Sequence, residues 1–250
     1  MLASNLSWYK IKQFIGAYIR KGTIDDINSD TQSLMYISES LGDNCEYGFW
    51  QRDHGYEPSS LFRWAISPPE SVLAFLQSPV ELFQKESLMP HTARLVKDEL
   101  SGFSFHSNLV LKSKKEGLKF RSGKFFEKQY EQEKSKIDYL QQKFFSQLKS
   151  KPKLFVIKRK KGFDASLVKE LLGCLRSYCD KHVLLVVTPS DEVKDSRCKK
   201  ISDGLYYGQI PFFANHAKAA QYHPTGWSTL MESMSKEPEL KAMVTKSGSN

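Results

Sequence analysis

The residues with the clearest capacity for chemistry lie in a short stretch, SLGDNCE, at positions 40–46. Apolar residues precede this stretch and a helical pattern follows it, so Cys45 is expected at the first turn of a helix. At that position the positive end of the helix dipole and the free backbone N–H groups favour a thiolate over a thiol. Because the thiolate is the reactive form of cysteine, the pattern indicates a nucleophile.

The residues around Cys45 would complete such a site. The backbone N–H of Cys45, aided by the side-chain amide of Asn44, is placed to stabilise an oxyanion. Gly42 permits a sharp strand-to-helix turn and lets a substrate approach the backbone closely. We therefore assign Asn44 to catalysis, and Gly42, Asp43 and Glu46 to substrate binding.

Two other interpretations of this loop stay open. A free cysteine is among the most buried residue types and often acts as a small apolar side chain, so Cys45 would then be structural. A glycine turn between a strand and a helix is also where α/β proteins bind phosphate. The single glycine, the missing Walker lysine and the negative charges of Asp43 and Glu46 argue against that phosphate site.

A cysteine nucleophile needs a base, and His106 is the best placed of the six histidines. It lies within GFSFHSNL, a predicted strand, where a hydrogen-bonded buried histidine is the alternative. His54 follows the Cys45 helix too far along to face back, and His182 begins a buried strand and is expected to be structural. The remaining three lie in irregular segments: His91, His216 and His223. Spacing selects no third member of a triad.

The composition is that of a globular chain with a basic surplus. Of the 250 residues 40% are hydrophobic, which is ample for a core, and the net charge is +9. The lysines concentrate at 112–124 and 149–161 without the aromatic and glycine pattern of a nucleic-acid platform. This pattern favours general solubility, with an anionic or carbohydrate-linked substrate as the alternative.

The four cysteines form no CxxC pair, which indicates reduced thiols rather than disulfides or a zinc ribbon. The N-terminal segment carries Lys10 and Lys12 inside an amphipathic helical pattern, unlike a signal peptide. No run approaches the roughly 20 apolar residues that a membrane helix needs. We predict a cytoplasmic protein with no cofactor, no bound metal and no transmembrane segment.

Hydrophobic periodicity predicts most of the helices and strands. The apolar run at 33–38 predicts a short strand, and Pro68-Pro69 predicts the start of a helix. Residues 93–111 alternate as in a hairpin that turns near Ser101-Gly102. A long charged helix is expected over residues 126–148.

The second half of the chain determines the predicted fold class. Two continuous apolar runs, KLFVIK and HVLLVVTP, flank an amphipathic helix with Asp164 as its N-cap, and ISDGLYYGQIPFF offers one more strand. Strand, helix and strand in this order are typical of a parallel βαβ unit. We predict an α/β protein with a mixed, mostly parallel sheet and helices on both faces. Residues 1–32 would be an amphipathic helix and linker, 33–235 one domain, and 236–250 a weakly ordered tail.

The segment ESLGDNCEYGFWQRDHGYEPSSLFRWA, residues 39–65, resembles the N-terminal signature of a bacterial family described as papain-like cysteine peptidases. The matching residues are the Ser-Leu-Gly turn, the Asn-Cys pair, Phe62 and Trp64. The resemblance implies a later histidine, for which His106 is the match, and an α+β papain-like fold as the alternative. Where that family often has Pro-Phe-Asp, this chain has Leu-Phe-Arg, and we assign Arg63 and Trp64 to substrate binding.

Three functions follow as hypotheses. The leading one is a cysteine-dependent hydrolase or acyl transferase with Cys45 as nucleophile and His106 as base. The second is an α/β transferase that acts on a carbohydrate or a nucleotide-sugar. The third is a non-catalytic binding module in which Cys45 is structural.

Overall fold

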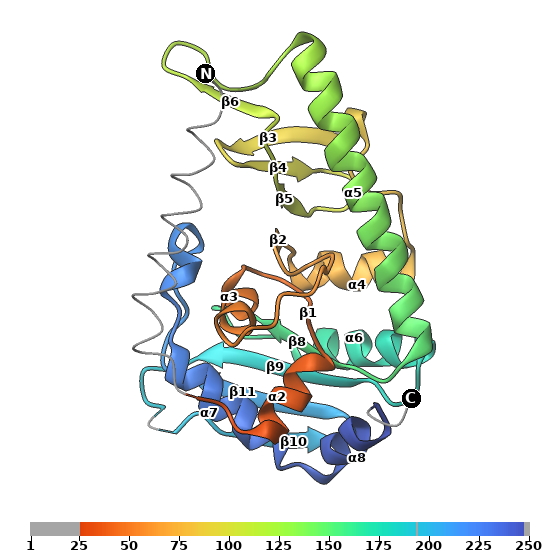
Figure 1. The fold of residues 1–250 in the computed structure, drawn as a ribbon, viewed down its shortest axis with the longest axis vertical. Helices are drawn as coiled ribbons and strands as arrows, with labels where there is room; N and C mark the ends of the chain where they lie inside the picture. Colours follow the sequence, from red (N-terminus) through yellow and green to blue (C-terminus); the bar gives the residue numbers. More distant parts are fainter. Residues whose placement is uncertain (1–25, 194, 248–250) are drawn as a thin grey trace.

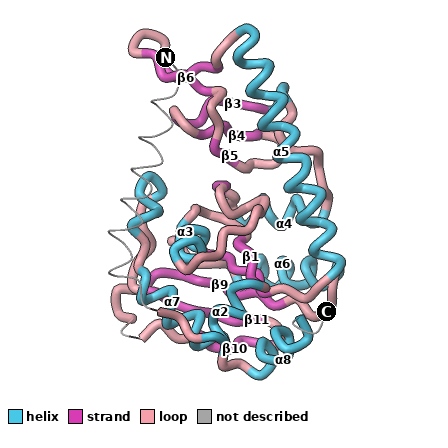
Figure 2. Tube along the Cα trace, in the orientation of Figure 1, coloured by secondary structure: helices cyan, strands magenta, loops and turns pink. Residues whose placement is uncertain are grey.

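A computed structural model describes residues 26–193 and 195–247 of the chain. The predicted N-terminal amphipathic helix lies outside these residues. Two groups of strands are visible, a main sheet and a smaller sheet above it in Figure 2. Within the described part of the chain, no helix is both long and apolar enough to cross a bilayer.

The main sheet has five strands in the order β1-β8-β9-β11-β10. The first four run parallel and β10 is antiparallel at one edge. Their bounds are Ser38–Ser40 for β1, Leu154–Lys158 for β8, Val183–Pro189 for β9, Leu205–Ile210 for β11 and Cys198–Ser202 for β10. A sheet of this kind confirms the predicted α/β class over the α+β alternative.

Helices cover both faces of this sheet because its central strands are apolar on both sides. Phe155 and Ile157 of β8 join one core cluster, whereas Leu154 and Val156 join the other. The first cluster includes α4 (Pro69–Gln77), α5 (Gly123–Ser150) and α6 (Ala165–Tyr178). The second includes α2 (Ser29–Tyr36), α3 (Glu46–Asp53), α7 (Pro224–Ser235) and α8 (Pro238–Ser247).

The smaller sheet is antiparallel and carries the predicted hairpin. Its order is β2-β5-β4-β3, with bounds Ala65–Ile66 for β2, Leu88–Thr92 for β3, Leu95–Asp98 for β4 and Ser104–His106 for β5. A separate pair, β6 (Val110–Ser113) and β7 (Gly117–Phe120), follows. Figure 1 shows α5 running alongside both sheets, from the β-hairpins down to the main sheet. The 28-residue helix α5 packs in the same core cluster as residues of both sheets and so connects the small sheet to the main one.

The predicted elements of the second half are present, including the Asp164 cap, whose side chain accepts hydrogen bonds from the backbone of Ser166 and Leu167. The predicted strand at residues 33–38 is wrong for most of its length. Those residues belong largely to α2, whose start is capped by the Asn28 side chain. An apolar run this short fits a helix turn as well as a strand, and the cap decides the outcome here.

Two remaining short elements and the C-terminal segment complete the chain. A 3-10 turn, η1 (Lys85–Ser87), precedes β3, and η2 (His216–Gln221) precedes α7. The expected weakly ordered tail at 236–250 contains α8, in which Leu240 is fully buried and Met243 nearly so. Both side chains pack in the second core cluster.

The turn that joins β4 to β5 depends on one buried carboxylate. Asp98 is fully buried and accepts hydrogen bonds from the backbone N–H of Phe83 (3.1 Å) and the hydroxyls of Ser87 (2.6 Å) and Ser101 (2.9 Å). These bonds tie the hairpin to the segment before β3. Asp98 therefore fixes the strand on which His106 lies.

We expect Asp98→Ala to lower the free energy of unfolding by about 2–4 kcal/mol, because it leaves several buried donors without an acceptor. Urea denaturation measures this change. The matched control is Asp195→Ala, which removes only a surface pair with Arg197 and should stay within about 0.5 kcal/mol. Equal effects of the two variants would contradict this role for Asp98.

Candidate functional site

A sharp corner joins β1 to α3 and places Cys45 at the carboxyl end of the main sheet. Gly42 and Asp43 both have positive φ, 98° and 75°, a conformation that glycine adopts freely and aspartate adopts more often than most residues. The Gly42 N–H donates to Ser40 Oγ at 3.1 Å. A Cβ at Gly42 would lie 1.5 Å from Ser67 Oγ. The glycine is thus required by the turn and by its contact with Ser67.

The structure brings Cys45 and His106 together. Cys45 is the N-cap residue of α3 and is 8% exposed, whereas His106 is exposed at the end of β5. The Cys45 Sγ lies 3.7 Å from the Nε2 of His106, although 61 positions separate them in the chain. A thiol from the main sheet therefore meets an imidazole from the small sheet at hydrogen-bonding distance.

Burial is the main reason that both groups are neutral at pH 7. Burial raises the pKa of the Cys45 thiol to about 11, against the opposing charge of Lys158. Burial also lowers the pKa of His106, and the charges of Arg94 and Lys136 lower it further. At neutral pH the pair is accordingly a thiol and an unprotonated imidazole.

This result runs against the thiolate expected from the helix N-terminus. A rise of the thiol pKa to about 11 corresponds to about 3 kcal/mol, whereas a helix dipole contributes about 0.3–1 kcal/mol. Burial is the larger effect. The Cys45 sulfur therefore needs a base to lose its proton.

Asn44 and Glu46 both point into the protein rather than toward solvent. Asn44 is buried, and its Oδ1 accepts hydrogen bonds from the Glu46 backbone N–H (2.9 Å) and from the ammonium of Lys158. Glu46 is fully buried, and its carboxylate accepts from the Ala214 N–H at 3.3 Å and lies 3.7 Å from Lys158 Nζ. We assigned the Asn44 amide to the oxyanion and Glu46 to substrate binding. Both side chains face the protein interior and already have partners there.

Arg63 is likewise occupied inside the protein. It is almost fully buried, and its guanidinium donates to the carbonyls of Gly48 (2.8 Å), Tyr56 (2.9 Å) and Pro58 (3.3 Å). These bonds hold the loop after α3 against the helix. Trp64 packs its ring at 5.0 Å from that of Phe49 in an edge-to-face arrangement. The geometry of Arg63 indicates a structural clamp where substrate binding was predicted.

Sequence reasoning missed Lys158, the last residue of β8. It is 1% exposed, which is rare for a lysine unless it is paired. The available signal was a lysine at the end of an otherwise apolar buried strand. Phe213, in the loop before η2, lies with its ring centroid 5.1 Å from the ammonium and closes this side of the site.

The other histidines have structural or peripheral places. His182 accepts from the Lys153 N–H (3.1 Å) and contacts the Leu148 carbonyl (2.9 Å), as expected for a structural residue, and burial lowers its pKa to about 4. His216 is exposed. Burial lowers the pKa of His216, and the charge of Asp43 opposes that change, so this histidine borders the corner.

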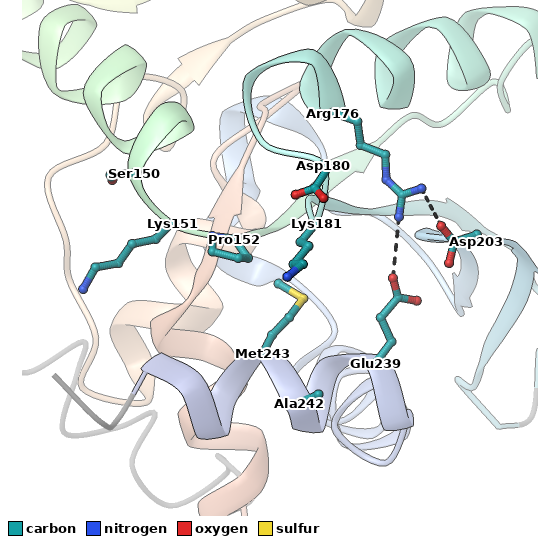
Figure 3. A pocket seen from close by; sticks show the side chains of 10 residues that line it. All are labelled: Ser150, Lys151, Pro152, Arg176, Asp180, Lys181, Asp203, Glu239, Ala242 and Met243. Atoms are coloured by element: carbon teal, nitrogen blue, oxygen red, sulfur yellow. Dashed lines mark hydrogen bonds and ion pairs between the residues drawn. The ribbon is translucent and has the colours of Figure 1, made fainter.

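Two cavities lie away from the Cys45–His106 pair. One, of about 600 Å³, is lined from the ends of α5 and α6 and from α8, and Figure 3 shows its charged side chains. There Arg176 pairs with Asp203 at 2.6 Å and Glu239 at 3.6 Å (Figure 3). Because these charges are already paired, they serve to join α6, the β10–β11 turn and α8. The second cavity, of about 590 Å³, is lined by the segment that follows β8, by the end of β9 and by residues along β11.

Comparison with known proteins adds no relative to this picture. No family model matches the chain, and neither the curated proteins nor the solved structures contain a significant match. Among the residues that the structure describes, no group of three or more histidine, cysteine, aspartate or glutamate side chains is arranged to hold a metal ion.

We expect Arg63→Leu to lower the free energy of unfolding by about 2–4 kcal/mol, since three backbone carbonyls lose a charged donor. Thermal or urea denaturation measures this change. The matched control is Arg197→Leu, where the replaced side chain is 75% exposed and the expected change is within about 0.5 kcal/mol. If the Arg63 variant is as stable as the wild type, the structural role is wrong and substrate binding is the better explanation of Arg63.

Proposed function

We propose that the protein is a cysteine-dependent hydrolase or acyl transferase in which Cys45 is the nucleophile and His106 the general base. The observation that carries this proposal is the 3.7 Å approach of Cys45 Sγ to His106 Nε2 across two sheets. A nucleophile and a base within such reach are the minimal parts of covalent catalysis, and the distance often shortens when substrate binds. The resemblance of residues 39–65 to papain-like cysteine peptidases agrees with this proposal.

The neutral state of the pair determines the first step. The Cys45 sulfur attacks the carbonyl carbon of an acyl substrate while its proton passes to Nε2 of His106. The carbonyl oxygen becomes an oxyanion, and its collapse breaks the bond to the leaving group, which takes the proton from His106. The product of this half-reaction is a thioester on Cys45 with His106 again neutral.

The second half-reaction releases the acyl group. Water, or another acceptor with a hydroxyl or amine, loses a proton to Nε2 of His106 and attacks the thioester carbon. The thiolate leaves and recovers its proton from the imidazolium. Water gives hydrolysis and another acceptor gives acyl transfer, and the backbone N–H of Cys45 at the start of α3 is the proposed donor to the oxyanion in both steps.

Pairing in the small sheet orients His106. In the β4–β5 register His106 lies opposite Leu95, and the next residue, Ser107, donates its N–H to the Arg94 carbonyl at 3.0 Å. Within the described ranges, no carboxylate is hydrogen-bonded to the imidazole. The proposed catalytic unit is therefore a Cys–His dyad whose base is oriented by backbone pairing.

We expect Cys45→Ala and His106→Ala to abolish or strongly reduce acyl transfer from an activated ester such as p-nitrophenyl acetate. Loss of the base should cost about 10²–10⁴-fold in rate. Mass spectrometry of the acetylated protein locates the acyl group, which should be on Cys45. The control is His91→Ala, because His91 lies in the same small sheet with its Nδ1 2.9 Å from Ser104 Oγ. The dyad would be ruled out if the acetyl group is found on residues other than Cys45 and the rate of acetylation is the same in both variants as in the wild type.

A second candidate function, a transferase that acts on a phosphate-bearing carbohydrate or a nucleotide-sugar, is favoured by the 590 Å³ cavity. Part of its lining follows the carboxyl ends of β8 and β9, where α/β sheets commonly bind ligands. Its charged lining residues are all lysines, and its other walls are mainly apolar or aromatic, such as Phe163 and Tyr207; the lysines are Lys160, Lys161 and Lys169.

For this second function, a thermal-shift panel of nucleoside phosphates and nucleotide-sugars at millimolar concentration is the direct test. A ligand present at 100 times its Kd should stabilise the protein by about 2.7 kcal/mol. Lys161→Gln and Lys169→Gln should reduce the ligand-induced rise in melting temperature. The control is Lys128→Gln, which changes an exposed residue of α5. No stabilisation by any member of the panel would exclude this function for these ligand classes.

A further inference from the structure

The side chain of Lys158 occupies an unusual place for a positive charge. It projects from the carboxyl end of β8 into the protein and is 1% exposed. Its ammonium donates to Asn44 Oδ1 and lies 3.7 Å from Glu46 Oε2, and the ring of Phe213 closes over it. Lys158 therefore contacts residues on both sides of Cys45 in the sequence, at positions 44 and 46.

A contribution to stability alone is a weak explanation of this arrangement. Removing two charges from water is costly, and buried ion pairs can often be replaced by apolar residues without loss of stability. Moreover, the Oε2 of Glu46 makes no hydrogen bond within the described residues. The pair is thus an expensive and incompletely satisfied arrangement, placed immediately beside the candidate nucleophile.

Charged groups surround the Cys45–His106 pair on two sides. The charge of the Lys158 ammonium acts on the thiol and lowers its pKa, in opposition to burial. Burial in turn disfavours the charged form of Lys158, while the negative charges of Glu46 and Asp43 favour it. On the other side His106 faces Arg94 and Lys136, and the exposed His216 lies at the edge, near Asp43.

We propose that Lys158 is a positioning residue of the Cys45 site, whose buried ammonium, held by Asn44 and Glu46, stabilises the thiolate as His106 removes the thiol proton. This proposal rests on the proposed function in one respect, namely that His106 is the base that accepts the thiol proton. The negative charge of Glu46 favours the charged form of Lys158 against burial, and Asn44 binds both the ammonium and the first N–H of α3. The positive charge and the start of the helix are thereby fixed relative to each other.

Three variants test this role: Lys158→Met, Glu46→Gln and the double variant. Each single variant leaves one buried charge without its partner, and we expect both to be less stable than the wild type. The double variant removes both charges and should recover much of that stability. The reactivity of Cys45 should not recover, because the stabilising ammonium is still absent.

The readout is the rate of Cys45 alkylation by iodoacetamide between pH 7 and pH 11, resolved by peptide mass spectrometry. In the Lys158→Met and double variants we expect the rate to fall about tenfold or more at each pH below the thiol pKa, because that pKa rises further when the ammonium is removed. Cys174 and Cys179, on the far end of α6, are internal controls and should be unchanged.

The outcomes separate this proposal from the proposed function. A folded double variant whose Cys45 reacts at the wild-type rate throughout this pH range would overturn the role of Lys158, even if ester hydrolysis by Cys45 and His106 is established. Conversely, the expected loss of Cys45 reactivity in a protein that shows no acyl transfer would support the role of Lys158 and refute the hydrolase. Loss of Cys45 reactivity with full stability in the double variant is the result that most directly supports the proposal.

Discussion

The parallel pairing of β1 with β8 is the contact on which the candidate site depends. Ser38 pairs with Leu154 and Ser40 with Val156, and the Leu41 N–H then donates to the Val156 carbonyl at 2.9 Å. This register carries the corner with Cys45 to the end of β8, where Lys158 emerges. A shift of one residue would turn the side chains of the three-residue strand to the opposite face and separate the lysine from Asn44 and Glu46.

Two charged side chains reinforce that pairing. Glu39 of β1 is 5% exposed and pairs with Lys153 at 2.5 Å, while its other oxygen accepts from Ser60 at 2.8 Å. One buried carboxylate thus connects the edge strand to the residue before β8 and to the loop that Arg63 clamps. Glu39 fixes the strand before the corner, and the Asn44–Lys158–Glu46 group fixes the residues on either side of Cys45. Charged contacts therefore help to position the thiol.

Sequence patterns predicted those parts of the fold that depend on neighbouring residues. The amphipathic helix capped by Asp164, the two buried strands around it and the hairpin near Gly102 all follow from local periodicity and turn chemistry. The Cys45 helix start and the choice of His106 also came from local signals. The mistaken strand at 33–38 arose where an apolar run was too short to distinguish a helix from a strand.

The remaining site features depend on contacts between distant residues. Lys158 and Asn44 are 114 positions apart, and no spacing rule links them. Arg63 was assigned to substrate binding, yet its guanidinium donates to one carbonyl of α3 and to two of the loop that follows it. The raised pKa of Cys45 was missed for the same reason: a helix start is visible in the sequence, whereas the burial that outweighs its dipole is produced by other segments.

In the sequence, β1 is separated from its partner β8 by all the strands of the small sheet and by α5. In a parallel pair this long connection is unavoidable, and closing it carries an entropic cost before any contact is gained. A ribosome-bound chain would therefore expose Cys45 before Lys158 has been synthesised. The thiol is buried, and its pKa raised, only once the second half of the protein has folded, so a fall in the reactivity of Cys45 reports that the domain is complete.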